Sequence, residues 1–250
     1  MKTSKLTNKY ALVTGGSRGI GRATCIELAR MGYNILINYN NNAEAAAETA
    51  REVNVIGQVA ECLKFDISDE KQVDDALNGW IENNPDSIIE ILVNNAGLRR
   101  DNLFVWINKN EWESVFHTNV DGFYHVSRRV LRAMIKQRYG RIVTVVSMSG
   151  LVGPSGQTHY AASKAALIAA TKSLSKEVGK RNVTVNSVAP GFIRTEMIAD
   201  INEETRAKGI PVKRFGEPEE VASLIGFLCS KKAGFITGEN MNIDGGGMLI

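Results

Sequence analysis

The sequence predicts an α/β fold in which a single doubly wound parallel sheet, of about seven strands, carries helices on both faces. Short apolar runs rich in β-branched residues alternate along the chain with longer segments whose apolar residues recur at helical spacing. Strands that alternate with helices form right-handed βαβ units and therefore a parallel sheet. A glycine-rich turn directly follows the first strand pattern. With 250 residues, the chain fits one large domain, and we expect a single domain over residues 1–250 with no linker or repeat.

The expected strands are short runs that carry the apolar signal most clearly. They are residues 10–14, 34–38, 58–64, 88–93, 141–147, 183–188 and 241–243. The fifth run is full of β-branched residues, which favour strands.

The expected helices fill the intervals between the strands. They are residues 19–31, ending at Gly32; 43 to about 53; a helix capped by Ser68 or Asp69; 109–137; 159–179; and 217–228, opened by Pro218. This succession predicts a Rossmann-type sheet. Residues 191–211 depart from the rhythm, and a long excursion near the ends of parallel strands is a candidate substrate lid.

Composition and charge exclude several classes of protein. The net charge is +3, with acidic and basic residues mixed along the chain, whereas a nucleic-acid-binding protein would gather its basic residues into a patch. Cys25, Cys62 and Cys229 lack metal-binding spacing, and we expect them to be reduced. The basic N-terminus has no apolar stretch behind it, and no apolar run approaches the roughly 20 residues that span a bilayer. We therefore expect a cytoplasmic protein that binds neither membrane nor nucleic acid.

The turn Thr14-Gly15-Gly16-Ser17-Arg18-Gly19-Ile20-Gly21 predicts a dinucleotide site. Glycines let the backbone approach a pyrophosphate closely, and the helix that follows offers free N–H groups and the positive end of its dipole. The spacing differs from the more familiar G-x-G-x-x-G pattern. The alternative is a tight turn between strand and helix that binds no ligand.

The region after the second strand favours NADP(H) over NAD(H). NAD-binding proteins usually place a carboxylate there for the ribose 2′-hydroxyl. This chain reads Asn38-Tyr39-Asn40-Asn41-Asn42, with no carboxylate before Glu44. Arg18 is positioned to bind a 2′-phosphate, unless it is simply a solvated surface arginine. Asp66 follows the third strand, where it can accept from an adenine amine, and Asn94–Gly97 ends the fourth, where small residues allow close approach. Simple caps or turns are the alternatives for both.

The spacing Ser147, Tyr160, Lys164 predicts the chemistry. Tyr160 and Lys164 are one helical turn apart and share a face. A nearby ammonium should lower the phenol pKa from its usual value of about 10, so that Tyr160 can exchange a proton with a carbonyl oxygen. Ser147, at the end of the fifth strand, can hydrogen-bond the same oxygen, with Ser149 as its competitor.

Asn119 is unusual because asparagine is unfavourable inside a helix. It is expected either to bind backbone across a kink or to hold a water in a proton relay to Lys164. His117, His125 and His159 lack metal-binding spacing and are expected to be non-catalytic, so no metal site is predicted.

These motifs together resemble those of the short-chain dehydrogenase/reductase family over essentially the whole chain. The likeness includes the glycine turn, Asp66, Asn94-Asn-Ala-Gly97, Asn119, Ser147, Tyr160-Ala-Ala-Ser-Lys164 and Pro190-Gly191-Phe-Ile-Arg-Thr195. It implies a catalytic tetrad of Asn119, Ser147, Tyr160 and Lys164, and a homotetramer built through long helices and the C-terminal region. With the turn and the strand ends, the resemblance gives the expected cofactor-binding residues: Gly15, Ser17, Arg18, Gly19, Ile20, Gly21, Asn38, Tyr39, Asp66, Ile67, Asn94, Ala96, Gly97, Tyr160, Lys164, Pro190, Gly191, Ile193 and Thr195.

Within that family the chain looks most like reductases of 3-oxoacyl chains carried by acyl-carrier protein, in fatty-acid or in polyketide and aryl-polyene-type synthesis. The supporting stretches include Arg100-Asp-Asn-Leu103 and Arg214-Phe-Gly-Glu-Pro218. An acidic carrier would dock on a basic face, for which Arg128, Arg129, Arg132, Lys136, Lys172 and Lys176 are candidates. Trp106 is a candidate for the acyl entrance, or else a buried or interface aromatic. The alternatives are a dehydrogenase of a free alcohol, ketone or sugar and, remotely, a non-catalytic dinucleotide sensor.

Overall fold

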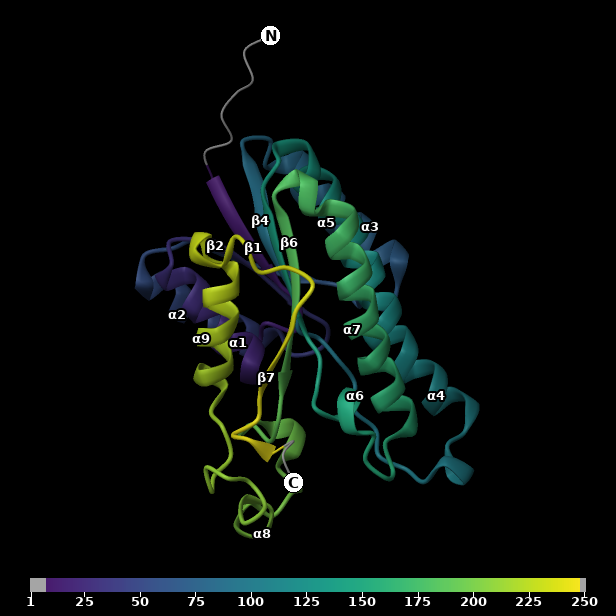
Figure 1. Ribbon diagram of the computed structural model, residues 1–250. Helices are drawn as coiled ribbons and strands as arrows, with labels where there is room; N and C mark the ends of the chain where they lie inside the picture. Colours follow the sequence, from purple (N-terminus) through teal and green to yellow (C-terminus); the bar gives the residue numbers. More distant parts are fainter. Residues whose placement is uncertain (1–7, 248–250) are drawn as a thin grey trace.

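The computed structural model describes residues 8–247 and contains one seven-stranded sheet (Figure 1). The strand order is β3-β2-β1-β4-β5-β6-β7, and every neighbouring pair is parallel. The strands are β1 (Asn8–Val13), β2 (Asn34–Tyr39), β3 (Ala60–Lys64), β4 (Ser87–Asn94), β5 (Gly140–Val145), β6 (Val183–Pro190) and β7 (Asn240–Ile243). The predicted doubly wound parallel sheet is confirmed, and each predicted strand lies within two residues of its observed bounds.

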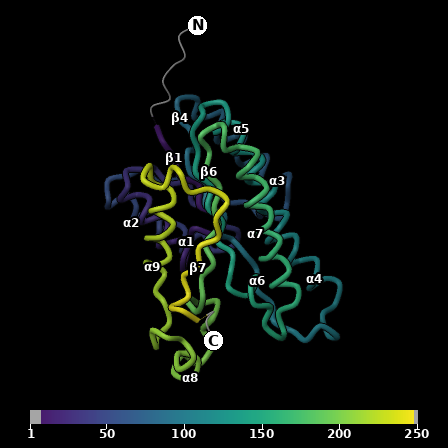
Figure 2. Tube along the Cα trace, viewed as in Figure 1, coloured from purple at the N-terminus to yellow at the C-terminus, as the bar shows by residue number. Residues whose placement is uncertain are grey.

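Helices cover both faces of the sheet, as the tube in Figure 2 also shows. On one face lie α1 (Gly19–Arg30), α2 (Ala43–Ile56) and α9 (Pro218–Cys229); on the other lie α3 (Glu70–Asn83), α5 (Gly122–Gln137) and α7 (Thr158–Val178). Asp69 caps α3 by accepting from the backbone N–H of Gln72. The helix α2 runs three residues past its predicted end, to Ile56, and Gly57 caps it with a φ of +96°, which suits glycine.

The core consists of two apolar layers that the sheet separates. Along β1, Ala11 and Val13 pack toward α1 and α9, whereas Tyr10 and Leu12 pack toward α3 and α5. Side chains of a strand alternate between faces, and a sheet buried on both sides is therefore apolar at nearly every position. This explains why the strands read as continuous apolar runs in the sequence.

The predicted long helix over residues 109–137 is interrupted, which corrects the expectation of one continuous helical stretch. It consists of α4 (Lys109–Phe116), a π-helical turn η2 (His117–Asp121) and α5. A π-turn inserts an extra residue into the helical ladder and is frequent at functional sites. Asn119 lies within it, so the residue that propensity singled out marks the irregular turn.

The excursion over residues 191–211 contains two short helices, η4 (Glu196–Ile198) and α8 (Glu203–Ala207). Four other short elements were not predicted from the sequence: η1 (Phe104–Trp106), α6 (Ser149–Val152), η3 (Gly179–Arg181) and η5 (Lys231–Ala233). In Figure 1, α6 and α8 lie at the end of the molecule where the strands finish. The basic stretch at residues 1–7 lies outside the described residues. Within residues 8–247, no helix is long and apolar enough to cross a membrane.

Candidate active site

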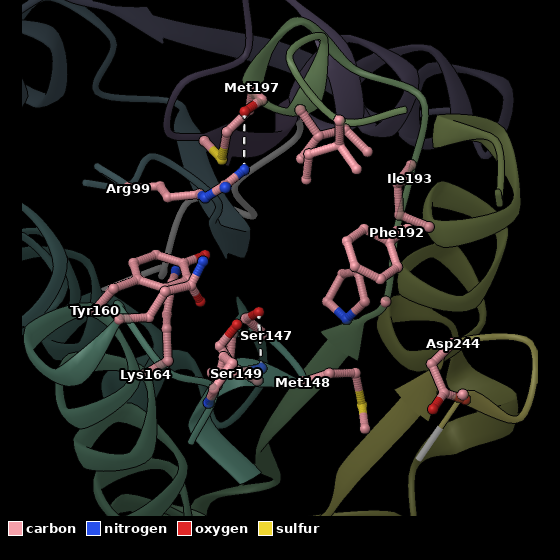
Figure 3. Close-up of a pocket in the computed structure, with 18 of the residues that line it drawn as sticks. Arg99, Ser147, Met148, Ser149, Tyr160, Lys164, Phe192, Ile193, Met197 and Asp244 are labelled. Atoms are coloured by element: carbon pink, nitrogen blue, oxygen red, sulfur yellow. Dashed lines mark hydrogen bonds between the residues drawn. The ribbon is translucent and has the colours of Figure 1, made fainter. Parts of the chain in front are cut away.

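A cavity of about 560 Å³ opens at the edge where the parallel strands end (Figure 3). Its walls come from several parts of the chain that are distant in sequence, and five of these carry most of the lining residues. They are the loop after β4 (Gly97, Arg99, Asp101), the end of β5 (residues 145–149), α7 (Tyr160, Lys164), the end of β6 (residues 190–195), and the excursion (Met197, Ile198, Ile201, Arg206). Ser147, Tyr160 and Lys164, predicted from their spacing, are all brought together here.

Lys164 is buried beside Tyr160. Its Nζ donates a hydrogen bond of 2.9 Å to the backbone oxygen of Val145, at the end of β5, and lies 5.8 Å from the centre of the Tyr160 ring. Only 4% of the residue is exposed, and burial lowers the Lys164 pKa from 10.5 to about 8, because a buried ammonium loses its hydration. The ammonium is therefore more acidic than that of an ordinary lysine.

The pKa of Tyr160 moves in the direction opposite to the one predicted. Burial is the largest cause and raises it above 10, while the hydrogen bond to Ser147 and the charge of Arg99 lower it. Because the Lys164 ammonium points toward Val145, it does not outweigh the desolvation of the phenol. In this environment Tyr160 is a neutral phenol at pH 7 that keeps a transferable proton.

Ser147 and Ser149, the two candidates for the serine that binds the carbonyl oxygen, both line the cavity, but their contacts differ. The backbone N–H of Ser149, which opens α6, donates to Ser147 Oγ at 3.1 Å, as the dashed line in Figure 3 shows. Ser147 Oγ also pairs with Tyr160. Ser147 is thus oriented toward the phenol, and Ser149 helps to hold it there.

Asn119 lies behind the cavity and binds backbone, one of the two roles expected for it. Its amide oxygen accepts from the Leu98 N–H at 2.8 Å, and its Nδ2 donates to the Leu98 oxygen at 3.1 Å and to Ser163 Oγ at 2.9 Å. A Cβ on Gly97 would come within 3.2 Å of the Asn119 amide oxygen and 3.3 Å of Lys164 Nζ. Gly97 therefore lets the π-turn and Lys164 approach the same point. The proton relay remains a prediction.

The glycine turn forms an open cradle next to the cavity. Gly15 and Gly19 have φ values of +62° and +54°, which favour glycine. A Cβ on Gly21 would lie 2.1 Å from the Gly15 oxygen. The first turn of α1 contains no acidic residue, and Arg18 at its N-cap makes no side-chain capping bond. These residues fit a dinucleotide, because N–H groups at an uncapped helix start attract a pyrophosphate.

Two asparagines brace this turn. Asn38 Oδ1 accepts from the Gly15 N–H at 3.2 Å, and its Nδ2 donates to the Phe65 oxygen at 2.9 Å. Asn95 was not among the expected cofactor-binding residues. Its side-chain Nδ2 donates to the backbone oxygens of Thr14 and Gly15. The cradle is thus shaped by side chains from the ends of β2 and β4.

The other expected cofactor-binding residues fall into two groups. Ile20, Gly97, Pro190, Gly191, Ile193 and Thr195 line the cavity. The second group lies around the cradle, and several of its side chains are engaged in the fold: Asn94 donates to Ser127, Ile67 packs in the core, and Asp66 accepts from Ser68 and Asn40. Such residues are available to a ligand mainly through their backbone.

The basic residues expected to dock a carrier are partly neutralised. Arg128 pairs with Glu70 and lies over the ring of Tyr124, and Arg129 pairs with Asp74 at 2.8 Å. Arg132, Lys136, Lys172 and Lys176 are exposed. Trp106 is 69% exposed on η1 and is not among the residues that line the cavity, so it is not a buried aromatic. Its placement at the acyl entrance or at an interface remains a prediction. Among residues 8–247, no group of three His, Cys, Asp or Glu side chains is placed to hold a metal ion.

The buried lysine predicts how stability depends on pH. Between about pH 8 and 10.5 the folded protein binds fewer protons at Lys164 than the unfolded chain, so its stability rises with pH across that window, and the full burial penalty applies below about pH 8. In Lys164→Met this titration is absent. We expect the free energy of unfolding of the wild type, minus that of the variant, to rise by about 2 kcal/mol between pH 7 and 10, as measured by urea denaturation. Lys172→Met, on the exposed side of the same helix, is the control. Parallel curves for the wild type and Lys164→Met would contradict the burial of a charged amine.

Comparisons with known proteins agree with this architecture. The family model for short chain dehydrogenases matches residues 9–206. The 3-oxoacyl-[acyl-carrier-protein] reductase FabG of Aquifex aeolicus is 45% identical over 97% of this chain and 98% of its own, and the one of Vibrio harveyi is 41% identical over 98% and 99%. The solved structure of acetoin dehydrogenase YohF from Salmonella typhimurium superposes with a TM-score of 0.89 at 33% identity, covering 97% of this chain and 98% of that chain. The chain therefore belongs to the short-chain dehydrogenase family.

Proposed function

We propose that the protein reduces 3-oxoacyl-[acyl-carrier-protein] to 3-hydroxyacyl-[acyl-carrier-protein], with NADPH as the reductant, in fatty-acid synthesis or a related assembly line. The observation that carries this proposal is the meeting of Ser147, Tyr160 and Lys164 in one cavity beside the glycine cradle. The names of the relatives at 41–45% identity support the substrate class.

The reaction needs a hydride at the 3-carbon and a proton at the 3-oxygen. When bound, the reduced nicotinamide supplies the hydride. Ser147 Oγ donates a hydrogen bond to the substrate oxygen and holds it against Tyr160. Tyr160 Oη gives its proton to that oxygen as the negative charge develops, which leaves a phenolate.

Lys164 then restores the proton. The Lys164 ammonium has a pKa of about 8, below the raised pKa of Tyr160. Proton movement from Lys164 toward the phenolate is therefore downhill. The proposal includes Asn119 as the residue that orders the path by which Lys164 is reprotonated from solvent, and the position of Asn119 and Lys164 against the same glycine supports it.

The cofactor proposal rests on charge. Asn38 and Tyr39 end β2 without a carboxylate that would repel a 2′-phosphate. The Arg18 side chain is 64% exposed and pairs with Glu196 at 2.6 Å. Because an exposed ion pair contributes little, a 2′-phosphate can displace Glu196 at small cost.

Arg18→Ala should therefore weaken the binding of NADPH without affecting the binding of NADH. We expect the KM for NADPH to rise about tenfold, which corresponds to the loss of one charge-assisted hydrogen bond. Arg22→Ala is the matched control, since Arg22 lies on the same helix and pairs with Glu52. Equal effects of Arg18→Ala on the two cofactors would contradict 2′-phosphate recognition.

A distorted cradle should weaken dinucleotide binding. In Gly21→Ala the new methyl group meets the Gly15 oxygen, so the turn must open, and we expect the Kd for the dinucleotide to rise at least tenfold in a calorimetric titration. Gly79→Ala places a methyl in open space on α3 and should leave the Kd unchanged. A wild-type Kd in Gly21→Ala would exclude the cradle as the binding site.

A second candidate is the reduction of a small free ketone, which the similarity to acetoin dehydrogenase favours. Oxidation of NADPH is to be followed with acetoacetyl-carrier protein, with acetoacetyl linked to free pantetheine, and with acetoin, in the wild type and in Tyr160→Phe. We expect turnover to be fastest on the carrier-bound substrate and to fall at least a hundredfold in Tyr160→Phe. Turnover of acetoin alone would favour the second candidate instead.

Carrier docking and assembly follow as further parts of the proposal. The exposed Arg132, Lys172 and Lys176, with Arg128 and Arg129 beside their carboxylates, form the proposed docking face for an acidic carrier. The proposed homotetramer uses the long helices and the C-terminal region, of which residues 248–250 lie outside the described part of the chain.

A further inference from the structure

The loop after β4 brings a second cation to the wall of the cavity that holds Tyr160. Arg99 lines the cavity, and its side chain is only 16% exposed. Figure 3 shows Arg99 and Tyr160 on the same side of the cavity, with the Arg99 guanidinium directed toward the backbone of Met197. The next residue, Arg100, is exposed and does not line the cavity. Two adjacent arginines of the same loop therefore occupy different environments.

The position of the Arg99 guanidinium is fixed by three segments of the chain. Its Nε donates to both carboxylate oxygens of Asp101 at 3.0 Å, and its Nη2 pairs with the same carboxylate. Asp101 is itself held by Gln157, which precedes α7, through a hydrogen bond of 2.9 Å. On the other side, Arg99 Nη1 donates to the backbone oxygen of Met197 in η4, at 3.3 Å. A guanidinium anchored in this way loses little additional freedom on acting.

The charge of Arg99 reaches the phenol. Arg99 lowers the pKa of Tyr160, and the opposite and smaller influence of Asp101 raises it, so the positive end of the ion pair dominates at the phenol. The phenol is buried, and charges act more strongly in such surroundings than in water. The other charged groups around the cavity are Lys164 on α7, whose Nζ points to Val145, Arg206 on α8 and Asp244 after β7; His159, next to Tyr160 in sequence, stacks on Trp112.

We propose that Arg99 is a positioning residue for the proton transfer: anchored by Asp101 and by the Met197 carbonyl, its guanidinium stabilises the negative charge that forms on Tyr160 Oη when the proton leaves for the substrate oxygen. Lys164 then serves mainly to return the proton. This inference rests on the proposed role of Tyr160 as the proton donor.

The test measures the acidity of Tyr160 directly and needs no substrate. The protein is labelled with tyrosine carrying ¹³C at Cζ, the Tyr160 resonance is assigned by its absence in Tyr160→Phe, and its shift is followed with pH. In Arg99→Gln the resonance should begin to titrate about one pH unit higher than in the wild type, since a nearby opposite charge shifts a pKa by one unit or more. Arg99→Lys keeps the charge and should titrate like the wild type. Arg100→Gln, the matched control, should also be unchanged.

Kinetics give a second reading on the same variants. In Arg99→Gln the alkaline inflection of kcat should move upward with the phenol, and kcat at pH 7 should fall by up to about tenfold, while the KM for the carrier-bound substrate stays constant. Unchanged titration of Tyr160 in Arg99→Gln, or an equal shift in Arg99→Lys, would overturn the proposal, because charge would then not be the cause. If the wild type turns over no carbonyl substrate, the proposed function fails, and the NMR titration still decides the role of Arg99.

Discussion

All seven strands of a parallel sheet end at the same edge, and the whole site depends on that constraint. The strand order reverses between β1 and β4, so the connections that leave these two strands run to opposite faces of the sheet and part at this point. The glycine cradle follows β1, and the loop with Gly97 and Arg99 follows β4. Ser147 follows β5, and Gly191 follows β6. Groups far apart in the sequence thus meet at one edge of the sheet, where side-chain contacts such as Gln157 with Asp101 and Asn119 with Ser163 hold them in place.

Burial then determines what these groups can do. It makes the phenol of Tyr160 less acidic and the ammonium of Lys164 more acidic than in water, so a proton passes more readily from the lysine to the phenolate. Such a site needs other groups to offset the cost of forming a buried phenolate. In the protein without substrate, Ser147, through a hydrogen bond, and Arg99, through its charge, both lower the pKa of Tyr160 and so act in that direction. The buried phenol and the residues that stabilise its negative charge therefore lie around one cavity.

The sheet and the three residues at the centre of the site were predictable because each rests on local patterns. Continuous apolar runs gave the strands, and the spacing of Tyr160 and Lys164 put both on one helical face. Only one residue in the sequence indicated the π-turn, namely Asn119, whose side-chain amide forms hydrogen bonds with the backbone of Leu98. The predicted direction of the Tyr160 pKa shift was wrong. The sequence indicates which charged residues lie near the phenol, but it does not show how deeply the phenol is buried. The sequence did not predict a role for Arg99, because Arg99-Arg100-Asp101 is typical of a solvated loop. Only the folded structure shows that Arg99 lines the cavity while Arg100 is exposed. For Trp106 the exposure excludes only the buried alternative, because the sequence could not show whether the fold would cover this side chain.

The central claim is that hydride arrives at carbon 3 of a carrier-bound chain while Tyr160 supplies the proton. The most direct measurement uses NADPH deuterated at the transferring position of the nicotinamide, with acetoacetyl-carrier protein, followed by mass spectrometry of the released acyl group. We expect one deuterium at carbon 3 of the 3-hydroxybutyryl product of the wild type, and almost no product from Tyr160→Phe in the same time. A product without deuterium, or an equal yield from Tyr160→Phe, would contradict it.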